Sequence, residues 1–190
     1  METHKIGTFE VDSSVMVVSD PCYSIGTWMT EEIWGVKPGT WHASIETEDT
    51  GDIFGVRIWK LHAVHSDYID KVDGLREINH GEFGVDSGQA GIFDYKHYQD
   101  NNDAAGMSYE HFVGKPWYDL CCTLTMRTEH DVGVLPHGVV SCSGLGDGLY
   151  EFKCFAPTDG PDKDKTVAIT LDYKLDEFGE LVQKLVHIND

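Results

Sequence analysis

The chain alternates between hydrophobic and polar residues along much of its length, which predicts strands with one buried and one solvated face. Trp41–Glu48 and Thr166–Leu175 show this pattern most clearly, with residues such as Trp41 and Ile169 on the apolar side. Phe54–Val64 carries apolar residues on both faces. A strand of that kind is expected at the centre of a sheet, where both faces are covered.

Two further segments are predicted to be strands because they are rich in residues that favour extended backbone. Leu120–Arg127 and Leu149–Phe155 are both enriched in Thr, Tyr, Phe or Cys. Leu181–Ile188 is expected to pair back onto Thr166–Leu175 through a turn at Asp176–Glu180.

Helix signals are few and short. The predicted helical turns are Thr30–Trp34, Asp67–Val72, Tyr95–Asn102 and Ser108–Val113. The polar stretches Glu46–Asp52 and Pro157–Lys165 are interpreted as exposed loops, because charge runs are usually solvated. We therefore expect one domain over residues 1–190. It should be mainly β, with antiparallel twisted sheets forming a sandwich or a partly open barrel, and with a few short helices.

Composition narrows the class of protein. The 190 residues are 41% hydrophobic and 25% charged, as in an ordinary folded protein. The 14 Lys and Arg against 33 Asp and Glu give a formal charge of −19. Nonspecific binding to nucleic acid or to an anionic membrane surface is therefore disfavoured, because such surfaces require clusters of basic residues.

The same sequence predicts a reducing, cytoplasmic location. It contains no apolar run of about 18 residues, and its start lacks the basic and apolar segments of a secretory signal. Its five cysteines form no CxxC pair, so neither a disulfide framework nor a structural zinc site is expected. Cys121 and Cys122 should point to opposite faces if they lie on a strand.

An internal echo stands out from this background. Phe9-Glu10-Val11-Asp12-Ser13 is followed by Asp20, and Phe83-Gly84-Val85-Asp86-Ser87 by Asp94, with an offset of 74 residues at every matched position. Each copy predicts a strand, an Asp-Ser turn and a second strand that is followed by an Asp. We favour the interpretation that each is a hairpin corner whose Asp bonds backbone N–H groups. The alternative brings Asp12, Asp20, Asp86 and Asp94 together in one cleft.

A second informative segment is the glycine-rich stretch Gly138–Tyr150. Four Gly and two Ser in thirteen residues leave little side-chain bulk, so the backbone can approach a ligand closely. The segment has neither the GK[ST] ending of a P-loop nor the following helix of a dinucleotide fold. A hairpin turn at Asp147-Gly148 is the simpler interpretation.

Other reactive side chains are less informative. Cys22, in Asp20-Pro21-Cys22-Tyr23, could act as a nucleophile only if a His or a cation lowered its pKa, and no such partner is identifiable by spacing. The histidines meet no known zinc spacing, so no metal site is predicted. The cofactor stays open, with a divalent cation possible at oxygen-rich loops but not predicted.

Three patches carry a resemblance to a known family. The segments VDS…SDPCY, VDSGQ…FD and GVVSCSGLGDGLY resemble those of an uncharacterised family of bacterial and phage proteins, a domain of unknown function with VDSG-type and SSG-x-GDG-x-Y-type motifs. The resemblance spans roughly Phe9 to Asp172. This chain departs from it at Ser14, where Gly is usual, and at Cys142 in the Ser-rich loop.

The resemblance implies a ligand-binding site rather than a reaction. The residues to which it points are Asp20, Cys22, Tyr23, Asp86, Ser87, Gly88, Gln89, Ser141, Ser143, Gly144, Asp147 and Tyr150. It also implies a bacterial or phage-infected cell as the setting, where small acidic proteins often counter host defences.

These observations favour a binding module for a small polar ligand, nucleotide- or sugar-like, or for a segment of a partner protein. A hydrolase built on clustered aspartates, with or without a metal, is the first alternative. An acidic inhibitor that mimics DNA is the second, since the charge would speed association with a basic partner. Neither the oligomeric state nor a catalytic residue is predicted.

Overall fold

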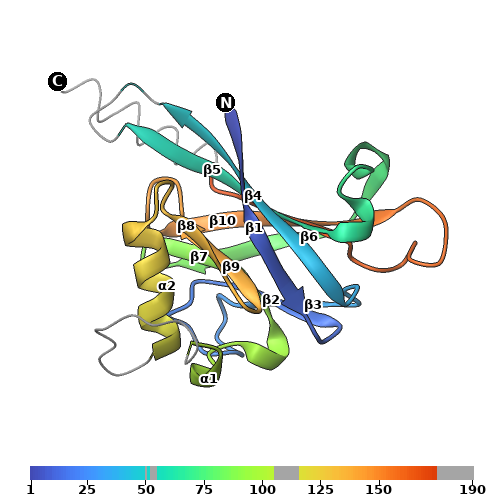
Figure 1. The fold of residues 1–190 in the computed structure, drawn as a ribbon, viewed down its shortest axis with the longest axis horizontal. Helices are drawn as coiled ribbons and strands as arrows, with labels where there is room; N and C mark the ends of the chain where they lie inside the picture. The colour runs from blue at the N-terminus through green and yellow to red at the C-terminus, as the bar shows by residue number, and fades with distance from the viewer. Residues whose placement is uncertain (50, 52–54, 105–115, 175–190) are drawn as a thin grey trace.

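The chain forms two antiparallel sheets stacked face to face, with one helix packed on the smaller sheet (Figure 1). The computed structural model describes residues 1–49, 51, 55–104 and 116–174. Within these residues no helix is long and apolar enough to cross a membrane. The expected fold class, mainly antiparallel β with a few short helices, is confirmed in the form of a sandwich without barrel closure.

The larger sheet has six strands in the order β1-β4-β5-β11-β10-β6. Their bounds are β1 (Glu2–Val11), β4 (Gly39–Asp49), β5 (Val56–His65), β11 (Ala168–Asp172), β10 (Gly148–Pro157) and β6 (Leu75–Val85). The smaller sheet has five strands in the order β3-β2-β7-β9-β8. Their bounds are β3 (Glu31–Trp34), β2 (Val15–Ser19), β7 (Gln89–Asp94), β9 (Gly138–Cys142) and β8 (Val132–Leu135).

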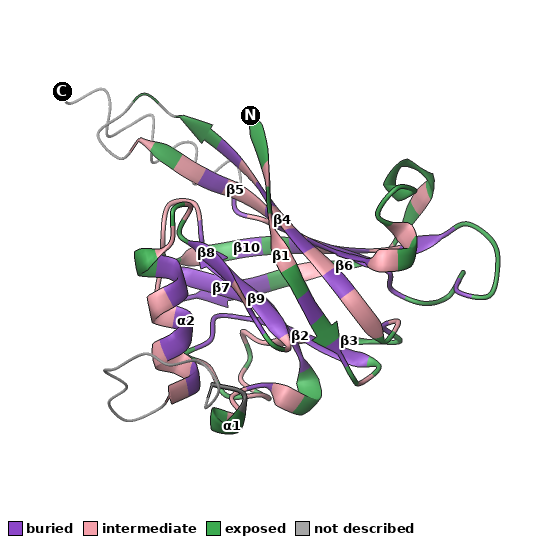
Figure 2. Ribbon diagram, in the orientation of Figure 1, coloured by how far each residue is buried: buried purple, intermediate pink, exposed green. Residues whose placement is uncertain are grey.

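Two hydrophobic cores flank the smaller sheet. The main core lies between the sheets, where Trp41, Phe83 and Tyr173 are fully buried. A second core lies between the smaller sheet and α2 (Pro116–Arg127), around Phe93 and Trp117. Both faces of the smaller sheet are therefore covered, and β2 and β7 are buried at every position (Figure 2).

The alternating patterns predicted the strands of the larger sheet correctly. In Trp41–Glu48 the four positions on the apolar side are buried and the polar ones are not. β5 lies between β4 and β11, which confirms the prediction of a central strand for the described part of Phe54–Val64. Leu149–Phe155 lies in β10, and the described part of Thr166–Leu175 contains β11. The predicted strand Leu181–Ile188, its turn and the predicted helix Ser108–Val113 lie outside the described residues.

Leu120–Arg127 is a helix, and the prediction of a strand there was wrong. Pro116 opens α2 at a position where a missing N–H costs nothing. The buried residues Trp117, Leu120, Cys121, Leu124 and Thr125 have helical spacing. Cys121 and Cys122 accordingly do not alternate across a strand; the first is buried and the second is half-buried.

Thr30–Trp34 shows the opposite error, because its predicted helical turn is strand β3. The strand pairs antiparallel with β2 and buries Ile33, while Trp34 is 69% exposed. The other two predicted helices are shorter than expected. Asp67–Val72 contains parts of two 3₁₀ turns, Ser66–Tyr68 and Val72–Gly74. Tyr95–Asn102 contains a 3₁₀ turn, Tyr95–His97, and only the start of α1 (Asn101–Ala104).

Neither polar stretch is simply an exposed loop. Glu46–Asp49 belongs to β4. The connection Pro157–Lys165 does join β10 to β11, but Asp162 within it is buried. Its carboxylate accepts bonds from Lys37 Nζ (2.6 Å) and Lys165 Nζ (3.0 Å). These ammonium groups stabilise the negative charge of a carboxylate that is largely shielded from water.

The internal echo extends to the whole architecture as a pseudo-two-fold arrangement. The larger sheet reads as β1-β4-β5 followed by the counterparts of these strands in reverse order, β11-β10-β6. In the smaller sheet β3-β2 is matched by β7-β9, and β8 has no counterpart among the strands that the structure describes. The strand registers agree with this symmetry. Phe9 on β1 pairs with Trp41 on β4, and Phe83, the counterpart of Phe9, pairs with Tyr150 on β10.

The pseudo-two-fold axis can be located from the pairing alone. Val18 on β2 lies opposite Ile92 on β7, and these two residues are themselves related by the 74-residue offset. The axis therefore passes through this pair. In the larger sheet, aligning the strand pairings of the two halves places the axis at the pair His62 and Thr170, where β5 pairs with β11. Each sheet is thus completed by pairing one half of the chain with the other.

Candidate functional site

Asp20 bonds the Asp-Ser turn of the second copy of the echo. Its Oδ2 accepts the backbone N–H groups of Asp86 (2.9 Å) and Ser87 (2.6 Å). Its Oδ1 accepts the Ser87 hydroxyl (2.7 Å) and the backbone N–H of Cys22 (2.8 Å). The Asp20 carboxylate is fully buried and has all its lone pairs engaged.

Asp94 does the same for the first copy. Its Oδ2 accepts the backbone N–H groups of Asp12 (2.7 Å) and Ser13 (3.2 Å). Its Oδ1 accepts the Ser13 hydroxyl and the backbone N–H of Lys96 (3.4 Å). We call the turn Asp12–Ser14 with Asp94 the first corner, and the turn Asp86–Gly88 with Asp20 the second corner.

The four aspartates therefore do not share one cleft. Asp94 lies opposite Met16, whereas Asp20 follows the end of the same strand. Four residues of extended backbone separate the corners by about 13 Å. The prediction that each Asp bonds backbone N–H groups within its own copy of the echo needs one correction. Asp20, from the first copy, bonds chiefly the turn of the second, and Asp94, from the second copy, bonds chiefly the turn of the first.

A third element of the echo went unnoticed in the sequence. Three residues after each buried Asp, a side chain returns to the turn acid of the other copy. The Tyr23 hydroxyl donates to Asp86, and His97 Nε2 lies 2.9 Å from Asp12 Oδ2. Tyr23 and His97 are related by the 74-residue offset. Comparing the two copies beyond the last Asp would have revealed this position.

Cys22 is exposed but not activated. Burial of its sulfur and the neighbouring Asp20 carboxylate raise its pKa to about 12, with Asp86 contributing further. At neutral pH the side chain is therefore a thiol, which is a weak nucleophile. It lines a cavity of about 430 Å³ with Pro21, Gln99, Asn101, Trp117 and Tyr118.

The glycine-rich segment forms the turn from β9 to β10 and is tied to the second corner. The Ser143 N–H donates to the Gly88 carbonyl (3.1 Å), and the Asp147 carboxylate accepts the Gly88 N–H (3.0 Å). Tyr150, buried, donates its hydroxyl to the Gly146 carbonyl (2.8 Å). Asp147 and the second corner are therefore neighbours, although they come from distant parts of the sequence.

Several predicted site residues serve the interior instead. Gln89 and Ser141 are buried. The Gln89 amide oxygen accepts the hydroxyl of Thr125 (3.3 Å), and Ser141 Oγ lies 3.0 Å from the Tyr173 hydroxyl. With Asp20 and Tyr150 also occupied inside the protein, these side chains are placed to stabilise the fold rather than to face a ligand.

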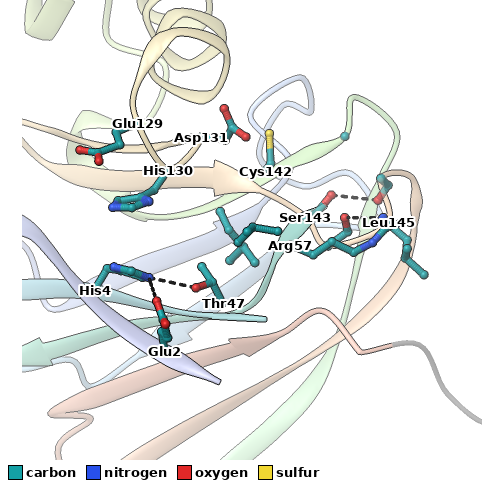
Figure 3. Close-up of a pocket in the computed structure, with 15 residues that line it drawn as sticks. Glu2, His4, Thr47, Arg57, Glu129, His130, Asp131, Cys142, Ser143 and Leu145 are labelled. Atoms are coloured by element: carbon teal, nitrogen blue, oxygen red, sulfur yellow. Dashed lines mark hydrogen bonds and ion pairs between the residues drawn. The ribbon is translucent and has the colours of Figure 1, made fainter. Parts of the chain in front are cut away.

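A cavity of about 600 Å³ opens beside the glycine-rich turn (Figure 3). Three predicted residues line it, namely Gly88, Ser143 and Gly144. The rest of the lining is Glu2, His4, Thr47, Val56, Arg57, Ile58, Glu129, His130, Asp131, Cys142, Leu145 and Gly146. We call this space the glycine-loop cavity.

Gly144 is the position at which the cavity wall needs glycine. Its φ of +49° lies in the left-handed region. A Cβ there would also come within 3.0 Å of Tyr173. The loop backbone therefore packs directly on Tyr173 and leaves the space above it open.

The polar groups of the glycine-loop cavity come from the larger sheet and from the loops beside the smaller one. The rings of His4 and His130 lie 4.2 Å apart at an interplanar angle of 32°. His4 Nε2 also lies 2.9 Å from the Thr47 hydroxyl. Across the cavity Arg57 reaches the Gly144 carbonyl (3.5 Å) (Figure 3).

These cavity residues could not be found from a sequence motif, with one exception. His130 stands in the Glu129-His130-Asp131 run, where an imidazole between two acids is visible in the sequence itself. His4 and Arg57 stand alone on β1 and β5. Only the pairing of both strands with β4 brings them to the same end of the sheet.

One cluster groups side chains of the kinds that bind metal ions, at a place where the sequence predicted no metal site. Asp12, Asp94, His97 and His137 each place one oxygen or nitrogen atom within 4.8 Å of the others. The cluster lies at the first corner. Sequence spacing could not reveal it, because His137 comes from the turn between β8 and β9, far from the other three residues.

The geometry described above is the only guide to function. Comparison of the chain with protein-family models, with curated proteins and with solved structures finds no match.

Proposed function

We propose that this protein is a binding module for a small polar ligand, held in the glycine-loop cavity. The observation that carries the proposal is the cavity itself, whose volume of about 600 Å³ is typical of small-molecule sites. Its walls combine β1, the start of β5, the second corner, the connection from α2 to β8, and the glycine-rich turn. These segments combine backbone polar groups with charged side chains and apolar surface, as ligand sites do.

The charges around the cavity favour a neutral ligand with several hydroxyl groups. Three carboxylates, on Glu2, Glu129 and Asp131, face one guanidinium, on Arg57. A phosphate group would be repelled by this excess of negative charge, whereas carboxylates accept hydrogen bonds from hydroxyl and amine donors. A saccharide or a nucleoside fits this balance better than a nucleotide does.

The paired imidazoles add aromatic surface to one wall. His4 and His130 present polarisable rings beside the polar groups. Such rings pack well against the face of a sugar or a nucleobase. Val56, Ile58 and Leu145 supply apolar contacts.

The proposal is tested by titrating the ¹⁵N-labelled protein with a panel of monosaccharides and nucleosides and following amide shifts by NMR. We expect saturable shifts confined to residues around the cavity. Leu145→Trp, which fills the space, should weaken binding at least tenfold. Leu149→Trp is the matched control, because Leu149 is 48% exposed and does not line the cavity.

Two results would contradict the proposal. Binding that is unchanged in Leu145→Trp would place the ligand elsewhere. The absence of saturable shifts with every probe, together with a native mass spectrum of the protein from its host that shows no additional mass, would remove the ligand altogether.

The hydrolase alternative finds less support. Asp20 and Asp94, the fully buried acids of the two corners, already accept four hydrogen bonds each. A general base needs a lone pair to receive a proton, and these carboxylates have none to spare. Asp12 and Asp86 lie at opposite corners, too far apart to act as a pair.

A further inference from the structure

We propose that the first corner binds a single divalent transition-metal ion of the zinc type through Asp12, His97 and His137. The site is separate from the glycine-loop cavity and does not depend on the proposed ligand. Imidazole nitrogen with carboxylate oxygen is a donor set that zinc uses in proteins. The atoms concerned lie within 4.8 Å of one another, a separation that a shared ion could span after small side-chain movements.

His137 is held in the tautomer that a metal ligand requires. Its Nδ1 lies 3.1 Å from the backbone carbonyl of Glu10, which can only accept a hydrogen bond. The proton therefore resides on Nδ1, and Nε2 carries the lone pair that binds a metal. A carbonyl that orients a ligating imidazole in this way is a common feature of metal sites.

Asp94 positions a metal ligand and does not itself bind the ion. Its oxygens accept bonds from the backbone of Asp12, from Ser13 and from Lys96. This arrangement fixes the backbone that carries the Asp12 carboxylate, which is 44% exposed and near His97. Three protein ligands would leave a fourth position of a tetrahedral ion open to solvent.

The second corner provides an internal comparison within the same molecule. Asp20 bonds the turn there as Asp94 does at the first corner, but Tyr23 stands where His97 stands. A corner of this type therefore forms without a histidine at this position. The imidazole of His97 adds a metal-binding nitrogen that the turn itself does not need.

Metal binding requires a defined rearrangement of the two imidazoles. The rings of His97 and His137 are stacked, with centroids 3.6 Å apart and an interplanar angle of 6°. One ion cannot lie in the planes of two parallel rings, so one ring must turn. The Lys96 ammonium, 3.6 Å from Asp12, must also give up its ion pair.

The experiment is a zinc titration of the full chain after removal of metals with a chelator, followed by calorimetry. We expect one Zn²⁺ per chain with a Kd in the micromolar range or below. The His97 and His137 ring signals should shift together in NMR spectra as the stack opens.

His97→Tyr is the decisive variant, because tyrosine already occupies the equivalent position at the second corner. It should preserve the fold, shown by an unchanged amide spectrum away from the corner, and weaken zinc binding at least tenfold. His80→Tyr and His130→Tyr are the controls. His80 has a side chain 74% exposed, and His130 belongs to the glycine-loop cavity; neither change should affect zinc affinity.

The proposal is overturned if zinc binds with the same affinity and stoichiometry in folded His97→Tyr, or if His130→Tyr abolishes the binding. Absence of any binding to the unmodified chain would also overturn it, and would identify the cluster as an ion pair between Asp12 and the imidazoles.

Discussion

A single buried carboxylate holds each of the two corners together. Asp20 and Asp94 are charged, fully buried and without a cationic partner among their bonded groups. Backbone N–H and hydroxyl donors replace the lost hydration instead, and hydrogen bonds to a charged acceptor are the stronger kind. The Asp-Ser pattern was recognisable in the sequence as turn chemistry, but most of the donors come from residues 66 to 82 positions away.

At this scale we predict equal losses from two matched substitutions. Asp20→Asn and Asp94→Asn each replace one acceptor oxygen by an NH₂ group that faces other donors. Each should lower the free energy of unfolding by about 3 kcal/mol. Urea denaturation measures this, and Asp159→Asn, at an exposed residue between β10 and β11, is the control. A difference above about 1.5 kcal/mol between the two would show that the corners are not energetically equivalent.

Strands and helices could be predicted from the sequence where only one face of the element is buried. They could not be predicted where the local residue pattern does not reveal what packs against the element. The larger sheet alternates because its outer face is solvated, so Trp41–Glu48 was assigned correctly. The smaller sheet is covered on both faces, and its period is lost. α2 carried a helical spacing of buried residues, but its Thr and Cys content suggested a strand. The charge run Pro157–Lys165 concealed a buried acid because its cationic partner Lys37 lies far away in sequence.

The β10–β11 connection yields a pH-dependent prediction. Hydrogen bonding from Lys37 is the main cause that holds the pKa of Asp162 well below its usual range, with Lys165 and Tyr68 contributing. The stabilisation is therefore complete above the unfolded pKa of about 4 and is lost as pH falls below that value.

Asp162→Asn should accordingly reduce the free energy of unfolding by about 2 kcal/mol between pH 5 and 8. The difference from the unmodified protein should shrink below pH 4. Chemical denaturation at a series of pH values measures both. Asp159→Asn, at an exposed position of the same connection, should have little effect at any pH. A deficit that persists unchanged to pH 2 would show that charge is not the cause.

At the scale of the whole molecule, the two halves of the chain are interleaved rather than adjacent. The axis pairs Val18 with Ile92 in one sheet and His62 with Thr170 in the other. Strands from one half of the chain alone cannot complete either sheet, because β2 and β5 would each be left with an unpaired edge.

A fragment of residues 1–74 should therefore not persist as a folded monomer. Alone, it should give the poorly dispersed NMR spectrum of an unfolded chain or associate with itself. Mixing it with residues 75–190 should restore the dispersed spectrum of the intact protein. A monomeric, well-dispersed spectrum from residues 1–74 would contradict the interleaved arrangement.

The reciprocal bonding of the corners also bears on how the chain matures during synthesis. The Asp20 carboxylate cannot accept bonds from its partner turn until Ser87 has left the ribosome, and the Ser13 hydroxyl cannot donate to Asp94 until that residue has been made. Domains that fold from the N-terminus onward can complete early segments while later ones are still being made. Here the first half has to wait, so the nascent chain emerges with an ionised acid and an open sheet edge that only its own second half can satisfy.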